Sequence, residues 1–206
     1  MCGRFVLMSD LSAIEGAFGM TIDEGMVRQS DRVVPGQMIA AVIYDGGRRP
    51  AQFSWGLIPS WAKDPSIARK MFNARAETIA DKPSFRSAFK KRRCLVIADG
   101  FYEWQKTGKT KTPFLIRLKS GQPFGFAGIY ESWVAPDRKV LDTCAIITTE
   151  PNDLIRPIHD RMPVILPKDK ETIWLDPAIQ DAGLLCPLLC PYPAKDMEKT
   201  ALTGTS

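Results

Sequence analysis

Short apolar runs separated by turn-forming residues constrain the fold of this 206-residue chain more than any other feature. Runs of four to eight such residues with turn signals at their ends are typical of strands. The expected strands lie at residues 39–44, 52–55, 94–98, 114–118, 124–129, 143–148 and 164–166. Turn-forming groups lie at 45–47, 107–109 and 120–123. The core is therefore expected to be chiefly sheet.

Helical patterns are short and irregularly placed between these runs. Ser9 could cap a helix over residues 10–18, where apolar residues share one face, and Gly19 could end it. Further helices are expected at 84–91, 152–158 and 170–175, which makes the class α+β rather than a regular alternation of strands and helices. The length suits one domain, which we place at residues 1–193, followed by a flexible tail at 194–206.

Composition excludes several classes of function. No apolar run approaches the ~20 residues of a membrane span, and the first residues lack the pattern of a secretory signal, so we expect a cytoplasmic protein without a membrane partner. Five scattered cysteines suit a reducing compartment. Cys186 and Cys190 have a spacing seen in zinc sites, but no second close pair exists. We therefore expect neither a metal nor a cofactor.

Cys2 is the first candidate for chemistry. Removal of Met1 would expose an α-amine and a thiol on one residue, and both can add to the same carbonyl carbon. With an aldehyde, the amine would form a Schiff base and the sulfur would close a thiazolidine ring. The alternative is that Cys2 is simply the residue that follows the initiator.

Three other segments contain candidate site residues, each with an ordinary structural alternative. Glu103 lies between two aromatic residues, and partial desolvation would raise its pKa, although a solvated glutamate at a strand end fits as well. His159 follows an expected helix and could titrate or be a structural histidine. Asn73 could orient an amine or a hydroxyl, or form a turn.

Basic and aromatic residues recur together at 61–63, 69–72, 85–86 and 89–93, and the net charge is +5. This mixture suits single-stranded nucleic acid, because cations pair with phosphates while an aromatic ring stacks on an unpaired base. Trp61 and Arg86 are candidates for this role. A solvated basic helix face is the alternative for residues 90–93.

Four segments in register, 1–5, 73–78, 98–104 and 158–163, closely resemble the SRAP (SOS response-associated peptidase) family over residues 1 to about 167. The resemblance implies a single α+β domain with a mainly antiparallel, barrel-like core and short flanking helices. It also implies a protein of the DNA damage response that binds single-stranded DNA and crosslinks abasic sites through a thiazolidine. Family members carry a peptidase assignment and show lyase-type chemistry through the Schiff base.

The same resemblance implies roles for individual residues. Cys2 would be the nucleophile, Asn73 would position its amine and the opened sugar, Glu103 would transfer protons, and His159 would assist ring opening and crosslink reversal. Arg4, Arg75 and Arg161 would hold phosphates, and Trp104 would pack against a base. The residues expected to contact DNA are Arg4, Pro35, Trp61, Arg75, Arg86, Trp104, Thr148 and Arg161.

The sequence departs from the family pattern in two places, the loop at 31–37 and the missing motif after residue 193, which both bear on contacts with DNA.

The rival functions are an amidotransferase or peptidase with an amino-terminal cysteine nucleophile, and a DNA-binding module in which Cys2 is inert. We expect a monomer whose partners are single-stranded DNA with abasic sites and replication-fork proteins. When bound to DNA, it would be associated with the nucleoid.

Overall fold

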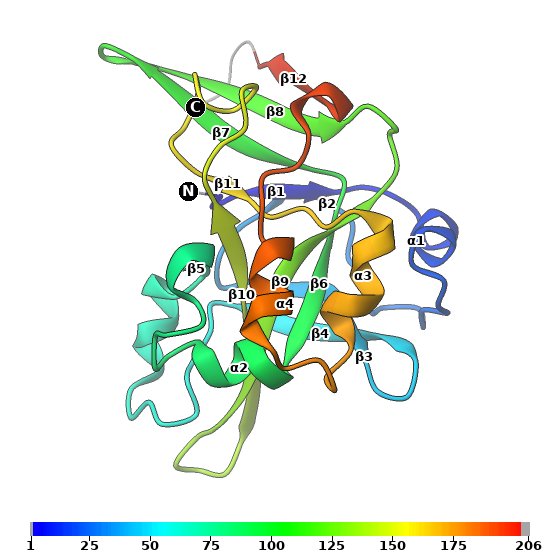
Figure 1. Ribbon diagram of the computed structural model, residues 1–206, viewed down its shortest axis with the longest axis vertical. Coiled ribbons are helices and arrows are strands. Elements are labelled where there is room, and N and C mark those ends of the chain that lie inside the picture. Colours follow the sequence, from blue (N-terminus) through cyan, green and yellow to red (C-terminus); the bar gives the residue numbers. More distant parts are fainter. Residues whose placement is uncertain (1, 203–206) are drawn as a thin grey trace.

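Five strands close into a barrel in the computed structural model, which describes residues 2–202 (Figure 1). They are β3 (Met38–Tyr44), β4 (Arg48–Trp55), β6 (Arg93–Ala98), β9 (Phe124–Val134) and β10 (Val140–Thr149). Their order is β10-β4-β3-β6-β9, and the pairing of β9 with β10 closes the ring. All of these pairs are antiparallel except β10 with β4. The α+β class with a mainly antiparallel barrel is thereby confirmed.

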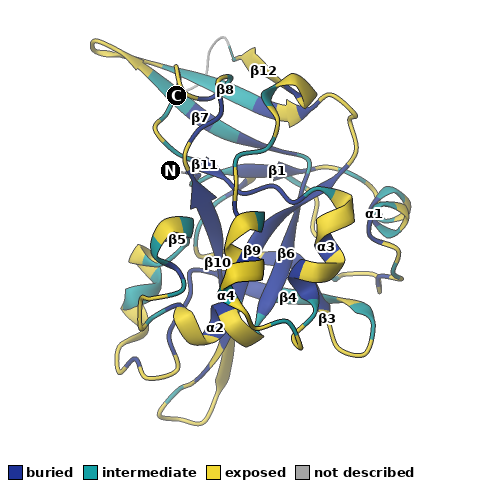
Figure 2. Ribbon diagram, viewed as in Figure 1, coloured by how far each residue is buried: buried dark blue, intermediate teal, exposed yellow. Residues whose placement is uncertain are grey.

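A second sheet lies over one end of the barrel (Figure 1). Its order is β12-β8-β7-β1-β2, with β1 (Phe5–Leu7), β2 (Ser30–Val33), β7 (Gly100–Thr107), β8 (Thr110–Leu118) and β12 (Met197–Ala201). Phe5 of β1 packs its ring 5.2 Å from that of Trp55 and 5.9 Å from that of Phe126, which both belong to barrel strands. These aromatic contacts join the two sheets into one buried core, which is dark blue in Figure 2.

The junction between β6 and β7 fixes β1 beside β7. A Cβ atom on Gly100 would lie 2.7 Å from the carbonyl oxygen of Ile116, so only glycine fits there without a shift of backbone. The preceding Asp99 carboxylate accepts hydrogen bonds from the Met8 and Ser9 amides, at 2.5 and 2.7 Å, and from the Ser9 hydroxyl at 2.7 Å. The chain just beyond β1 is thus tied to the start of β7.

Short elements complete the structure around the barrel. Two brief strands lie on β10: β5 (Asn73–Arg75) is parallel to it and β11 (Met162–Pro163) is antiparallel. The α-helices are α1 (Leu11–Phe18), α2 (Arg86–Lys91), α3 (Lys168–Leu175) and α4 (Ala182–Leu185), and the 3-10 helices are η1 (Pro65–Lys70), η2 (Ala76–Thr78), η3 (Cys186–Leu188) and η4 (Ala194–Asp196). No helix in the range 2–202 has both the length and the apolar character to cross a membrane.

Four expectations from the sequence differ from the structure. Asp10 rather than Ser9 caps α1, because its side chain accepts from the Ala13 amide at 2.8 Å. The helix expected at 152–158 is replaced by successive turns over residues 153–158, because Pro157 has no N–H to continue a helical ladder. Residues 164–166 form one isolated bridge, Ile165 with Phe126, rather than a strand. Residues 194–201, expected in a tail, form η4 and β12, which pairs with β8; residues 203–206 lie outside the described range.

Candidate functional site

Cys2 lies just before β1 and is fully buried. The Asn73 side-chain amide, at the start of β5, donates to the Cys2 carbonyl oxygen at 2.8 Å. The Oδ1 atom of Asn73 is also buried, and it accepts no hydrogen bond from residues 2–202. A buried acceptor of this kind costs stability unless a ligand satisfies it, so Asn73 is placed to receive a donor that enters the site.

The pairing of β1 with β7 places Glu103 close to Cys2. Phe5 is opposite Phe101, and the Tyr102 amide donates to the Arg4 carbonyl at 2.9 Å. The Glu103 side chain is almost fully buried, at 2% exposure, and this burial raises its pKa from 4.5 to about 7. Burial, together with the charge of Glu103, raises the pKa of the Cys2 thiol well above its usual range. The resting thiol is therefore protonated and needs a base before it can attack.

His159 follows the turns at 152–158. The Gln105 side chain of β7 donates to the Pro157 carbonyl at 2.9 Å and so holds these turns beside Glu103. The Nδ1 atom of His159 lies 3.0 Å from the Arg161 amide nitrogen and 2.8 Å from Asp160 Oδ1. Burial lowers the pKa of His159. Both contacts are made at Nδ1, so the Arg161 amide and the Asp160 carboxylate together orient the ring.

A surface cavity of about 300 Å³ opens between these groups, and its lining residues are Glu103, Trp104, Lys106, Lys111 and His159. The Arg4 guanidinium lies 4.8 Å from the centre of the Trp104 ring and 6.0 Å from that of Tyr102. A cation held over aromatic rings beside a cavity suits a ligand with phosphates and flat bases.

Arg161 is engaged within the protein. Its guanidinium makes two contacts with the Glu77 carboxylate, at 2.6 and 3.0 Å, and donates to the Thr148 carbonyl at 2.6 Å. Thr148 itself is fully buried, and its hydroxyl lies 3.5 Å from the Ala74 carbonyl. Of the two residues, only Arg161 retains a partly exposed side chain from which to reach DNA.

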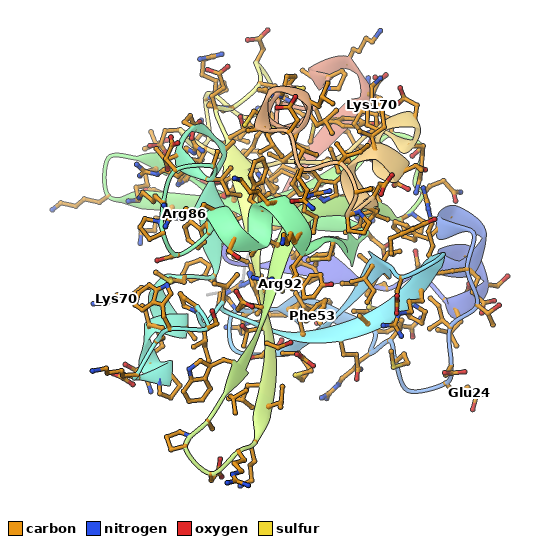
Figure 3. All side chains as sticks on the ribbon, turned by 60° about the horizontal axis from the view of Figure 1, so that its bottom comes forward. Glu24, Phe53, Lys70, Arg86, Arg92 and Lys170 are labelled. Atoms are coloured by element: carbon orange, nitrogen blue, oxygen red, sulfur yellow. The ribbon has the colours of Figure 1, made fainter. Side chains whose placement is uncertain are left out.

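The other residues expected at a DNA surface are distributed more widely. Arg75 is exposed on β5, two residues after Asn73, and Pro35 is half-buried in the turn between β2 and β3. Trp61 lines a different cavity, of about 530 Å³, with Lys63 and Lys70. Arg86 projects from α2, at the end of the barrel remote from β7 (Figures 1 and 3). The structure thus brings together the four expected catalytic residues with Arg4 and Trp104, but places Trp61 and Arg86 elsewhere.

Three residues of this region were not predicted from sequence: Glu77, Lys106 and Lys111. The lysines flank a Thr-Gly-Lys turn that the sequence identifies only as a turn, and Glu77 lies within a recognised segment without a role of its own. Within the described part of the chain, no group of three or more His, Cys, Asp or Glu side chains could hold a metal ion.

The five-stranded barrel thus carries a buried thiol near its amino end, a carboxyl group of pKa about 7 and an imidazole of lowered pKa. The chain belongs to the family "SOS response associated peptidase (SRAP)", whose sequence model matches residues 1–204. The family membership expected from the four segments is confirmed.

The sequences of the relatives described below align with 61% to 96% of this chain. The Bacillus subtilis "Abasic site processing protein YoqW" is 50% identical over 202 residues, which cover 96% of this chain and 90% of the relative. The Xenopus tropicalis "Abasic site processing protein HMCES" is 35% identical over 149 residues, or 61% of this chain and 44% of that protein. A crystal structure from Bacteroides thetaiotaomicron superposes with a TM-score of 0.91 at 28% identity, covering 98% of this chain and 92% of the other.

Proposed function

We propose that this protein processes abasic sites in single-stranded DNA by forming a covalent crosslink through Cys2. The single observation that carries the proposal is the placement of the Cys2 thiol, fully buried and close enough to Glu103 for the carboxyl charge to raise its pKa. The names of the relatives, which describe abasic site processing, support the same substrate.

The proposed reaction uses both nucleophiles of Cys2 after the residue before it has been removed. The ring-opened abasic sugar presents an aldehyde at C1′. The Cys2 amine adds to this carbon, and loss of water gives an imine. The sulfur then adds to the imine carbon, and the thiol proton ends on the ring nitrogen. The net change is one thiazolidine formed and one water released, without an oxidant or reductant.

Glu103 is suited to the proton transfers. At a pKa of about 7, both its acid and its carboxylate are populated at neutral pH. The acid can protonate the hydroxyl group that leaves as water, and the carboxylate can take the proton of the high-pKa thiol as sulfur attacks. One side chain therefore serves both steps.

His159 and Asn73 would act on the sugar. The His159 imidazole, which lines the cavity, can donate a proton to the sugar oxygen that leaves as the ring opens. The buried Asn73 Oδ1 can accept from the Cys2 amine or from a sugar hydroxyl. Arg4, Arg75 and Arg161 would hold the flanking phosphates, with Trp104 against a base. The imine would also give the protein lyase-type reactivity, and the protein would act as a cytoplasmic monomer.

Intact-mass spectrometry tests the proposal. Protein shown to begin at Cys2 is mixed with a single-stranded oligonucleotide that carries one abasic site. We expect an adduct that survives denaturation and whose mass is the sum of the two components less one water. Cys2→Ala should abolish it, while Cys2→Ser should give only an imine trapped by borohydride. Cys186→Ala, at an exposed cysteine, is the matched control and should react normally.

Absence of an adduct with the wild-type protein, or an undiminished adduct with Cys2→Ala, would refute the proposal. Release of ammonia from glutamine by the wild-type protein would instead support the amidotransferase alternative, in which the sulfur attacks an amide.

A further inference from the structure

Two lysines face each other across the hairpin formed by β7 and β8. Lys106 is directly opposite Lys111 in the strand register, and both are exposed near the hairpin tip, which is yellow in Figure 2. Like charges directly opposite each other destabilise a strand pair. Neither lysine forms an ion pair with any residue in the range 2–202, whereas Lys199 of the neighbouring β12 contacts the Phe114 ring and the Leu154 carbonyl. The lysine pair therefore has an uncompensated charge.

The two lysines line the cavity of about 300 Å³ together with Glu103 and His159. Burial is the main cause of the lowered pKa of His159, and the positive charge of Lys106 contributes to it. The positive charge of Lys106 is therefore close enough to the site to influence His159. An anionic ligand in the cavity would meet both ammonium groups.

The hairpin is held in this position at its base. Gln105, next to Lys106, donates to the Pro157 carbonyl beside His159 at 2.9 Å. On the other edge, β12 pairs with β8 over five residue pairs. The hairpin in Figure 1 is therefore anchored on both edges up to the residues that precede the lysine pair, which lies near its extended tip.

Cationic and aromatic side chains alternate along one face of this ribbon. Successive side chains of a strand point to opposite faces, so Tyr102, Trp104 and Lys106 share a face, at about 7 Å per step. The Arg4 guanidinium lies over the two rings. This gives the order cation, ring, cation from Arg4 through Trp104 to the lysine pair, which is the arrangement that binds a single strand by phosphate pairing and base stacking.

We propose that Lys106 and Lys111 bind backbone phosphates of the DNA strand on one side of the abasic nucleotide, with Trp104 against the intervening base. The inference rests on the proposed function, because the abasic sugar at Cys2 fixes which part of the strand reaches the hairpin. The strand would leave the site along the β7–β8 ribbon. The lysines act in binding, not in the bond-forming steps.

A salt titration of non-covalent binding tests the contact. The probe is a single-stranded oligonucleotide with a tetrahydrofuran residue, an abasic analogue without an aldehyde, so that no crosslink forms. Each phosphate contact on a single strand contributes about 0.7 to the slope of log affinity against log salt. We expect the double variant Lys106→Gln/Lys111→Gln to lower this slope by about 1.4. The control Lys82→Gln/Lys119→Gln removes the same charge from two exposed lysines elsewhere on the surface and should keep the wild-type slope.

Shortening the oligonucleotide on one side of the analogue tests the direction of the strand. The wild-type protein should lose affinity when the flank on one side is removed and not when the other is removed. The double variant should be insensitive to both. Equal slopes for the double variant and its control, or an unchanged flank dependence in the double variant, would overturn the inference.

The proposed function is measured separately, as the adduct with an authentic abasic oligonucleotide. A slope difference without an adduct would leave the lysine contact standing and remove the crosslinking function. An adduct without a slope difference would do the reverse.

Discussion

Replacement of Glu103 by glutamine should change how the stability of the protein depends on pH. Burial raises the pKa of this carboxyl group from 4.5 to about 7, so the folded protein holds its proton more tightly than the unfolded chain does. A difference of about 2.5 pH units in pKa corresponds to at most about 3.4 kcal/mol of stability. Glutamine has nearly the same shape and does not titrate, so the variant lacks this dependence.

The sign follows from the direction of the shift. Below pH 4.5 the carboxyl group is protonated in both states, and the wild-type protein has its full stability. As the pH rises from 4.5 to 7, the unfolded state releases the proton first, and the wild-type protein loses up to about 3.4 kcal/mol relative to Glu103→Gln. Above pH 7 the difference stays constant. At pH 8 the variant should therefore melt about 10 °C higher, relative to the difference at pH 4.

Thermal and urea unfolding of the two proteins from pH 4 to pH 9 provides the measurement. Glu24→Gln, at an exposed glutamate marked in Figure 3, is the control for the loss of one carboxylate and should follow the wild-type curve. Parallel curves for the wild-type protein and Glu103→Gln, within about 0.5 kcal/mol across this range, would refute a raised pKa. The assignment of Glu103 as a proton donor at neutral pH would then fail as well. The same variant should crosslink abasic DNA more slowly, because the amide cannot exchange protons.

Two further predictions concern residues that hold the site in place. Glu77→Gln weakens the pair that orients Arg161, whose amide in turn holds His159, so the crosslinking rate at saturating DNA should fall about five-fold, or ~1 kcal/mol; an unchanged rate constant would show that Arg161 needs no such partner. Asp99→Asn removes the charge behind three hydrogen bonds to Met8 and Ser9 and should cost about 2 kcal/mol in urea unfolding with an unchanged m-value; a cost below about 0.5 kcal/mol would contradict the anchoring of β1 to β7.

Barrel strands were predictable where both of their faces are buried. The run at 94–98 corresponds to β6, Arg93–Ala98, in which every residue is buried. In contrast, β7 was missed, because it begins at a glycine and carries the buried Glu103, which breaks the apolar pattern of a strand. The helix expected at 152–158 failed for a local reason, since Pro157 has no N–H to continue a helical ladder.

The identity of the site residues came from four sequence segments, but their geometry could not. Asn73 reaches Cys2 only because β5 pairs in parallel with β10, and Glu103 reaches it because β1 pairs with β7, about a hundred residues away. Such pairings have no local signal. For the same reason, sequence could not show that Thr148 is buried or that Arg161 is paired with Glu77, because both depend on neighbours from other strands.

The groups proposed to react come from two separate sheets. Cys2 directly precedes β1 and Glu103 lies on β7, both in the five-stranded sheet β12-β8-β7-β1-β2, whereas Asn73 lies on β5, which pairs with β10 of the barrel. The contacts of Phe5 with Trp55 and Phe126, together with the hydrogen bond from Asn73 to the Cys2 carbonyl, keep the two sheets aligned. A small slide between them would separate the groups without altering any one of them. Substitutions at Phe5, Trp55 or Phe126 should therefore lower the crosslinking rate before they unfold the chain. The crosslinking rate would then report how well the two sheets are aligned.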